Sequence, residues 1–435
     1  MNPTHPPVGP YSVVDVDLDS DLSAPLRDPA LHEELWVVAR RRGVPQAVVE
    51  TSRTQAVAAL AEVSGTTATA PLDGVADSAL PTATVIVCSI VSRLADLRRC
   101  LTQLDALAYP DVELLLVDNR PTLPADDPLP AILADHPRIR MVRCATPGLS
   151  AARNVGIRAA TGEIVAFTDD DTLVDPAWLE AIGRRFVSEP DLDAVTGLIL
   201  PAELETPAQV YFERYYGGFA GVRTYRRFTA RAGRRLPGRA RVELRDESGD
   251  LVRRMAVYGA GALGAGANMA FRREALVRVR GFDESLGLGT PSRGGEDLAM
   301  LMRLLWNGAA VGYEPAAVIF HKHRVEYAEL ATQMRYYGLG YTATLTSLVW
   351  RDPRHALGLA VLAGPAIKAF VVGSLARVRG VAGGAASDAQ GDGPAFPREL
   401  WLLELRGLPA GPVAFLRSLA AERRRSAAAA PPSSS

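Results

Sequence analysis

Three consecutive carboxylates, Asp169, Asp170 and Asp171, follow a short apolar segment of the sequence, Ile164 to Phe167. The segment reads as a buried strand that comes after a helix and a glycine-marked turn, so the carboxylates stand where the strand ends. In an open α/β sheet, ligands bind in the crevice beyond the carboxyl ends of the strands. Carboxylate oxygens placed there can hold a divalent metal against a bound phosphate. The alternative is a solvated turn, or aspartates that cap a helix N-terminus.

A second acidic pair, Glu296 and Asp297, comes directly after Gly294 and Gly295 and opens an apolar segment, Leu298 to Trp306, that predicts a helix. Either carboxylate could accept the proton of a hydroxyl group that acts as a nucleophile. The structural alternative is that the pair complements the dipole at the helix N-terminus. Adjacent residues of a helix point about 100° apart, so we expect only one of the two to face a substrate.

Two histidines, His321 and His323, stand at alternate positions after the strand-like segment VGYEPAAVIF. An imidazole at the end of a strand could complete a metal site with the aspartates. The sequence does not distinguish which of the two would bind, and a structural role is the alternative for each.

The elements that must position these residues follow a βαβ pattern. An apolar run from Thr82 to Ile90 predicts a strand buried on both faces. A helix is expected from Leu94 to Ala108, and further strands are expected from Val112 to Val117 and from Arg138 to Arg143. This repetition predicts an α/β fold, with a mostly parallel central sheet flanked by helices and right-handed crossovers.

Four segments, GLSAARNVGI, GEIVAFTDDD, GANMAFRREAL and GGEDLAM, resemble in order and spacing the family 2 glycosyltransferases of the GT-A fold. The resemblance covers about residues 82 to 325. It implies a nucleotide-sugar donor, Mg²⁺ or Mn²⁺ as cofactor, and inversion at the anomeric carbon. The acceptor would be a hydroxyl group of a glycan, a lipid or a small molecule.

The resemblance also implies roles for the matching residues. Asp297 would be the general base, with Glu296 beside it as the second candidate. The donor side would comprise Ser89, Asp118, Arg153, Asn154, Asp169 and Asp170; the metal ligands would come from Asp171, Asp169, His321 and His323; and the acceptor side would comprise Gly294, Gly295 and Asn268. The loop from Ile90 to Arg93 is one residue longer than in many members, so its contacts do not follow from the resemblance.

Composition limits the range of partners. The chain has 435 residues with 48 basic and 49 acidic side chains, and this balance does not indicate a nucleic-acid partner. The three cysteines have no metal-ligand spacing, and the first residues do not form a secretory signal, so we expect reduced thiols in the cytoplasm.

The domain organisation follows from shifts in composition. We expect an accessory module at residues 1–56, containing a β-hairpin, then a linker at 57–81 and the catalytic domain at 82–325. A helical C-terminal extension at 326–420 and a disordered tail at 421–435 complete the chain.

The arginine-rich segment from Arg223 to Arg254 shows no hydrophobic period and is interpreted as a mobile, solvated flap. The longest apolar stretch, Ala356 to Ala376, contains Pro365 and Lys368 and is flanked by arginines. A membrane span needs about 20 apolar residues with few charges, so a buried or interfacial helix is favoured. Arginines beside such a helix suit anionic headgroups, which predicts peripheral contact with the inner face of the cell membrane.

Two other function classes stay open. A nucleotidyltransferase would also use carboxylates and a metal, but it would typically carry a glycine-rich basic loop after the first strand, where this chain has Ser89 to Arg93. A non-catalytic sugar-nucleotide-binding subunit is the third class, and the intact acidic triplet and Glu296–Asp297 pair argue against it.

Overall fold

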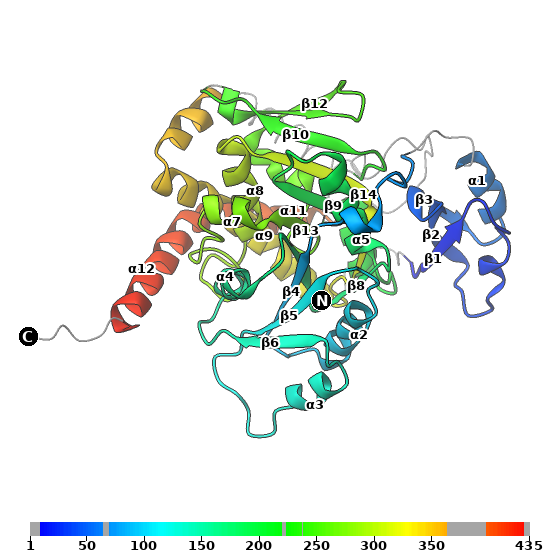
Figure 1. Cartoon of the computed structure of the whole chain (residues 1–435), viewed down its shortest axis with the longest axis horizontal. Helices are drawn as coiled ribbons and strands as arrows, with labels where there is room; N and C mark the ends of the chain where they lie inside the picture. Colours follow the sequence, from blue (N-terminus) through cyan, green and yellow to red (C-terminus); the bar gives the residue numbers. More distant parts are fainter. Residues whose placement is uncertain (1–8, 64–68, 220–222, 237, 363–396, 430–435) are drawn as a thin grey trace, which may run out of the picture.

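The computed structural model of the chain describes residues 9–63, 69–219, 223–236, 238–362 and 397–429. The described elements form two sheets, one of three strands near the N-terminus and one of 11 strands that is flanked by helices (Figure 1). The predicted α/β class, with a large central sheet and a helical C-terminal region, is confirmed.

The central sheet contains the strands that carry the acidic triplet and the histidines. Its order is β12-β11-β10-β14-β9-β13-β7-β4-β5-β6, with β8 paired to β14. The strands are β4 (Ala83–Ser89), β5 (Val112–Asp118), β6 (Ile139–Arg143), β7 (Ile164–Asp169), β8 (Thr172–Val174), β9 (Ala194–Pro201), β10 (Phe228–Ala232), β11 (Arg241–Arg245), β12 (Leu251–Ala256), β13 (Met269–Arg272) and β14 (Ala310–His321).

The sheet is mixed rather than mostly parallel. Strands β6, β5, β4 and β7 are parallel neighbours, as the βαβ pattern predicts, and β9 is parallel to β14. Strand β13 lies antiparallel between β7 and β9, and β10, β11 and β12 extend the sheet as antiparallel neighbours. The reason is the connection lengths, because short turns join β10 to β12 where a parallel pair would need a longer crossover.

Strand β14 contains a bulge opposite β9. Glu314 pairs with Gly197 and Val318 pairs with Leu198, so residues 315–317 have no partner on β9. Regular pairing resumes from Val318 to the end of the strand. The bulge therefore sets the register of the last residues of β14.

Helices flank the central sheet, and the two nearest the C-terminus pack mainly on another helix (Figure 1). The helices are α2 (Leu94–Asp105), α3 (Leu129–Ala134), α4 (Leu149–Ala159), α5 (Trp178–Ser188), α6 (Pro207–Val210), α7 (Arg273–Arg278), α8 (Glu296–Trp306), α9 (Tyr327–Arg351), α11 (Arg398–Gly407) and α12 (Gly411–Ala429), with a π-helical turn at Tyr211–Tyr215 and a 3-10 helix, η5, at Val257–Leu263.

Side chains that alternate along β4 enter two separate hydrophobic clusters. Ile86 packs with Val117 and Phe167 on one face, and Val87 packs with Leu114 on the other. All five side chains are buried. Burial on both faces explains why the strands of the parallel half read as continuous apolar runs.

The N-terminal sheet consists of β1 (Ser12–Asp17), β2 (Glu34–Arg41) and β3 (Val44–Ser52), followed by α1 (Ala56–Val63). Strands β2 and β3 form the predicted hairpin. Its two turn residues, Arg42 and Gly43, both have positive φ, at 49° and 79°, which matches the twist of the flanking strands. Helix α1 occupies the first residues of the segment that we interpreted as a linker.

The arginine-rich segment is not a flap within its described residues, because it forms β10, β11 and β12. Alternate apolar side chains point inward, and Ala230, Val242 and Leu244 are buried. Charged residues occupy the intervening positions and obscure the period of two in the sequence; they are Arg231, Arg241, Glu243 and Arg245.

The C-terminal region is helical in its described parts. Helices α11 and α12 pack on α9, and α12 runs to Ala429, well into the predicted tail. Residues 363–396, which hold most of the Ala356–Ala376 stretch, lie outside the described residues. Within the described chain, none of the helices combines the length and the hydropathy that a membrane crossing requires.

Candidate active site

The acidic triplet forms the turn between β7 and β8, at the edge of the sheet where the parallel strands end. Ser89 at the end of β4 pairs in register with Asp118 at the end of β5, and Asp169 lies on the other side of β4. On the antiparallel side, His321 at the end of β14 pairs with Thr172 of β8. The ends of β4, β5, β7 and β14 thus lie close together at one edge of the sheet, as predicted.

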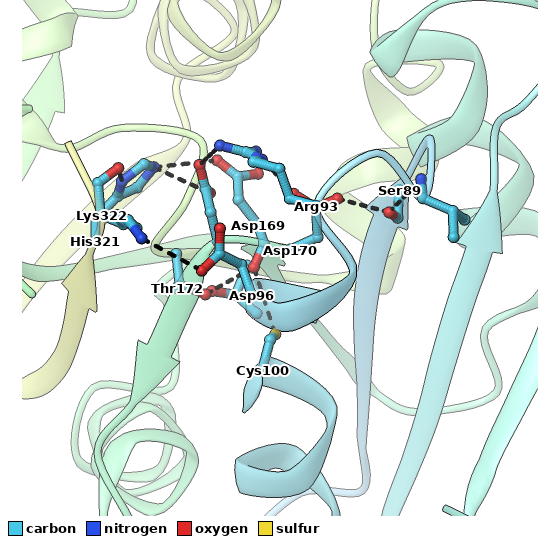
Figure 2. A network of polar contacts seen from close by, with 12 residues as sticks. Ser89, Arg93, Asp96, Cys100, Asp169, Asp170, Thr172, His321 and Lys322 are labelled. Carbon is cyan, nitrogen blue, oxygen red and sulfur yellow. Dashed lines mark hydrogen bonds and ion pairs between the residues drawn. The ribbon is translucent and has the colours of Figure 1, made fainter. Parts of the chain in front are cut away.

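Asp169, Asp171 and His321 each offer one ligand atom, and these atoms lie within 4.8 Å of one another. The His321 Nε2 atom lies 3.5 Å from Asp171 Oδ1 and 3.9 Å from Asp169 Oδ2 (Figure 2). The His321 Nδ1 atom lies 2.9 Å from the Lys322 carbonyl oxygen, which can only accept a hydrogen bond, so Nδ1 carries a proton. Nε2, on the other side of the ring, faces the carboxylates and is the atom available to a metal ion. Two carboxylates and this imidazole fit Mg²⁺ or Mn²⁺.

His323 lies outside this cluster, which corrects the expectation that either histidine could bind the metal. Its Nε2 atom lies 2.6 Å from Glu213 Oε2, and its ring packs against Phe212 and Phe219. Burial holds the pKa of His323 well below its ordinary value. His323 is therefore part of the core behind the site.

Asp170 is not a member of the cluster of Asp169, Asp171 and His321, and its side chain points toward the loop after β4. Its Oδ2 atom accepts a hydrogen bond of 2.6 Å from the Ser89 hydroxyl, and its Oδ1 atom lies 3.1 Å from Arg93 Nη2 (Figure 2). The Arg93 Nη1 atom lies 2.7 Å from Asp171 Oδ2. Arg93 was not among the predicted site residues, although a basic residue just after a strand end was the available signal.

The pKa values of the three carboxylates in the turn are shifted in different directions. Burial raises the pKa of Asp169 and of Asp170. Burial also opposes ionisation of Asp171, but His321 and Arg93 outweigh it and lower the pKa of Asp171. Asp171 is thus the member of the triplet that stays ionised most readily, as suits a principal metal ligand.

Arg153, on α4, connects the acidic turn to the start of α8. Its Nη2 atom lies 3.4 Å from Asp169 Oδ1, and its Nη1 atom donates to Glu296 Oε1 at 3.1 Å. It also donates to the Gly266 carbonyl oxygen at 3.3 Å and lies over the Phe282 ring. The side chain is 3% exposed, so Arg153 is a fixed link between two acidic groups rather than a free donor-binding side chain.

The two acidic residues at the start of α8 have different surroundings. Glu296 is buried against Arg153, and burial raises its pKa to about 7, with Asp297 adding to the effect. Asp297 is partly exposed, and its Oδ2 atom accepts a hydrogen bond of 2.8 Å from the Gly266 N–H. Only Asp297 therefore combines access from solvent with a fixed orientation.

Gly294 and Gly295 shape the entry to α8. Gly295 has φ of 87°, and a Cβ atom there would collide with Thr344 and with the Gly340 carbonyl oxygen of α9. A Cβ atom on Gly294 would have no heavy atom within 4 Å among the described residues. Gly295 is thus needed for helix packing, whereas Gly294 is open.

Two predicted site residues hold other parts of the protein together. The Asn154 side chain bonds to both the N–H and the carbonyl oxygen of Phe282, at 2.8 Å and 3.0 Å, and to Glu284 at 3.0 Å. Asp118 is buried and bonds to Arg120 through both carboxylate oxygens, at 2.9 Å and 2.8 Å. Arg120 was not predicted, although it follows Asp118 by two residues.

Asn268 does not reach the acceptor side. It is fully buried, and its amide nitrogen donates to the carbonyl oxygens of Leu198 and Ala317, at 2.9 Å and 2.8 Å. Its Oδ1 atom accepts a hydrogen bond of 2.8 Å from Trp178 Nε1. These bonds satisfy the backbone at the bulge of β14, which is a structural role.

The curated proteins most similar to the chain include two glycosyltransferases. The chain is 25% identical over 296 residues to the pre-mycofactocin glycosyltransferase of Mycobacterium tuberculosis, covering 67% of this chain and 52% of that protein. It is 24% identical over 208 residues to a glucosyl-dolichyl phosphate glucuronosyltransferase of Haloferax volcanii, covering 47% of this chain and 57% of that protein. The chain thus spans about half the length of the curated relatives it matches.

A likeness to a solved structure was also found. The mannosyltransferase of Pyrobaculum calidifontis, solved in complex with GDP-Man and Mn²⁺, is 18% identical with a TM-score of 0.44, and the match covers 79% of this chain and 91% of that one. Residues 84–276 match the sequence profile described as glycosyl transferase family 2. This match covers less than half of the chain, and it marks residues 84–276 as similar to that family.

Proposed function

We propose that the protein transfers a glycosyl group from a nucleoside diphosphate sugar to an acceptor hydroxyl group, with inversion at the anomeric carbon. The observation that carries the proposal is the cluster of Asp169, Asp171 and His321 at the strand ends, joined through Arg153 to a second acidic pair. The similarity of residues 84–276 to glycosyl transferase family 2 supports the same reaction class. The acceptor class stays open between a glycan, a lipid-linked sugar and a small molecule.

Asp171, Asp169 and His321 are the residues that would hold Mg²⁺ or Mn²⁺. When bound, the cation supplies positive charge that stabilises the diphosphate leaving group. The chain itself contributes two cations beside the same carboxylates, Arg93 and Arg153. Asp118, fixed by Arg120, is the residue that we propose for the nucleotide side, because it ends the neighbouring strand.

Asp297 is the proposed general base. Its carboxylate is partly exposed, and the Gly266 N–H fixes its orientation, so it can accept the acceptor proton as the oxygen attacks the anomeric carbon. Glu296 is buried and paired with Arg153, and we assign it the role of holding that arginine.

The test is the release of nucleoside diphosphate from a panel of nucleotide sugars, with and without Mn²⁺ or Mg²⁺. We expect metal-dependent turnover with at least one donor, and loss of this turnover in Asp171→Asn, which should still fold. Turnover that is equal with and without a metal, in both proteins, would contradict the metal-dependent mechanism.

We also propose peripheral contact with an anionic membrane surface. The support is the apolar sequence from Ala356 to Ala376, with Arg351, Arg354, Arg377 and Arg379 on its two sides. Fractionation is expected to place part of the protein with membranes and to release it in high salt or carbonate. Retention after the carbonate wash would indicate an integral segment instead.

A further inference from the structure

The two arginines beside the acidic turn are held in different ways. Arg153 is 3% exposed and contacts Glu296, Asp169 and the Gly266 carbonyl oxygen. The side chain of Arg93 is 35% exposed, and its ion pairs within the described chain are those with Asp170 and Asp171. Arg153 is fixed in place, whereas Arg93 can leave its partners without breaking the core.

The position of Arg93 in the chain also permits its side chain to move. It is the residue before the first turn of α2, and the loop that leads to it passes through Val91, which has φ of 56°. The side chain thus projects from a loop rather than from a strand. A change in its side-chain rotamer leaves the pairing of β4 unaffected.

The carboxylate of Asp171 faces a different partner with each oxygen. Oδ1 faces His321 Nε2 at 3.5 Å, and Oδ2 faces Arg93 Nη1 at 2.7 Å. A divalent cation held by Asp171 and His321 would therefore share one carboxylate with a guanidinium. Two positive groups a few ångströms apart in a partly buried site repel each other.

A diphosphate supplies an alternative partner for Arg93. Guanidinium groups bind phosphate oxygens through charge-assisted hydrogen bonds, much as they bind carboxylates. A diphosphate bound against the metal cluster would lie within the same site as the exposed end of Arg93.

We propose that Arg93 is an exchangeable counter-cation, which neutralises Asp170 and Asp171 in the ligand-free protein and transfers to the diphosphate when a divalent cation takes Asp171. This inference rests on the proposed function of the site. It predicts that the metal and the diphosphate bind cooperatively, because each relieves the unfavourable interaction that the other would meet alone.

The first test is calorimetric titration of the full-length protein with Mn²⁺ alone. We compare the unmodified chain with Arg93→Gln, Asp171→Asn and the control Arg98→Gln. Arg98 lies on the adjoining helix α2, is 48% exposed and pairs with Asp135. Arg93→Gln is expected to bind Mn²⁺ about threefold to tenfold more tightly, because the competing cation is gone. Arg98→Gln should bind Mn²⁺ as the unmodified chain does.

The second test titrates UDP, GDP or ADP at saturating Mn²⁺, and then titrates Mn²⁺ in the presence of the same nucleotide. Arg93→Gln is expected to bind the nucleotide more weakly and to lose most of the enhancement of Mn²⁺ affinity by the nucleotide. If Asp171→Asn abolishes Mn²⁺ binding but Arg93→Gln binds Mn²⁺ no better than the unmodified chain, the exchange is wrong and the metal site stands. If none of the proteins binds Mn²⁺, both the exchange and the proposed metal site are wrong. Tighter Mn²⁺ binding with unchanged nucleotide affinity would refute the transfer to the diphosphate.

Discussion

At the scale of single residues, neighbouring carboxylates acquire separate roles from their surroundings. Glu296 and Asp297 are adjacent in the sequence, yet their environments differ. Glu296 is buried and accepts a hydrogen bond from the Arg153 guanidinium, whereas Asp297 is partly exposed and accepts one from the Gly266 N–H. Pairs of acidic groups in unequal environments are a common basis for dividing acid, base and structural functions.

The assignment of the base predicts unequal effects of two isosteric substitutions. Asp297→Asn should lower kcat by at least about two decades, since general-base catalysis contributes about 10² to 10⁴ in rate. Nucleotide affinity should stay nearly unchanged, because Asp297 makes none of the contacts of the metal cluster. Steady-state kinetics and calorimetry measure the two quantities.

Glu296→Gln is the matched control for that experiment. It keeps a hydrogen-bond acceptor for Arg153 and should cost less in kcat than Asp297→Asn. If the large loss of kcat occurs in Glu296→Gln and is absent in Asp297→Asn, the two roles are exchanged.

The raised pKa of Glu296 predicts a pH-dependent contribution to stability. Burial raises this pKa from 4.5 to about 7, so between these values the folded protein binds a proton that the unfolded chain has released. The contribution of Glu296 to stability therefore falls as pH rises through this window, and it is constant above it. Relative to the unmodified chain, Glu296→Gln should gain melting temperature between pH 5 and pH 8. Scanning calorimetry of both proteins at the two pH values measures this, and a constant difference would contradict the assignment.

At the scale of elements, the start of α8 depends on close packing against α9. Gly295→Ala would place a Cβ atom against Thr344 in a backbone conformation of positive φ. We expect a loss of about 1 to 3 kcal/mol in stability and a reduced kcat, because the displaced helix carries Asp297. Thermal denaturation and turnover measure the two effects.

Gly294→Ala is the matched control, since a Cβ atom there has space. Its stability should stay within about 0.5 kcal/mol of the unmodified chain. A raised KM for the acceptor in Gly294→Ala, at unchanged stability, would support the acceptor role that the family resemblance implies for this position.

The sequence predicted the parallel half of the sheet because strands buried on both faces leave continuous apolar runs. It did not predict β10 to β12, where inward residues such as Val242 and Leu244 alternate with charged ones. It placed the acidic turn correctly, but could not choose between His321 and His323. That choice depends on the register of β14, which three-dimensional packing determines.

Asn268 is a residue to which the sequence assigned a binding role although its role in the structure is to stabilise the core. A polar residue in a glycine-rich segment resembles a binding residue in sequence, yet its amide satisfies backbone groups in the core. The hydrogen-bond partners of Asn268 are about 50 to 90 residues away along the chain, so local sequence patterns cannot indicate them.

At the scale of the whole molecule, the C-terminal helices support the start of α8 through α9. Helix α9 contacts α8 on one side and α11 and α12 on the other. Gly338 of α9 lies so close to the Glu404 carbonyl oxygen of α11 that a Cβ atom would not fit between them. The C-terminal extension is thus packed tightly on the helix that holds Gly295 in place.

Gly338→Ala should therefore separate α9 from α11 and lower the melting temperature by several degrees, with a smaller effect on turnover than Gly295→Ala. Thr332→Ala, at an exposed position of α9, is the control and should leave the melting temperature unchanged. Equal melting temperatures for the two variants would show that α11 moves freely relative to α9.

The bulge of β14 has a consequence for how the gene can vary. Side chains of a strand alternate between its faces, so losing or gaining one codon among the paired residues 318–320 would turn His321 to the opposite face of the sheet, whereas the unpaired residues 315–317 can absorb such a change. The strand would still be apolar and could still pair, but the imidazole would leave the carboxylates. Insertions or deletions of an odd number of residues among residues 318–320 would therefore disrupt the site, whereas substitutions at the same positions would not reverse the face of His321.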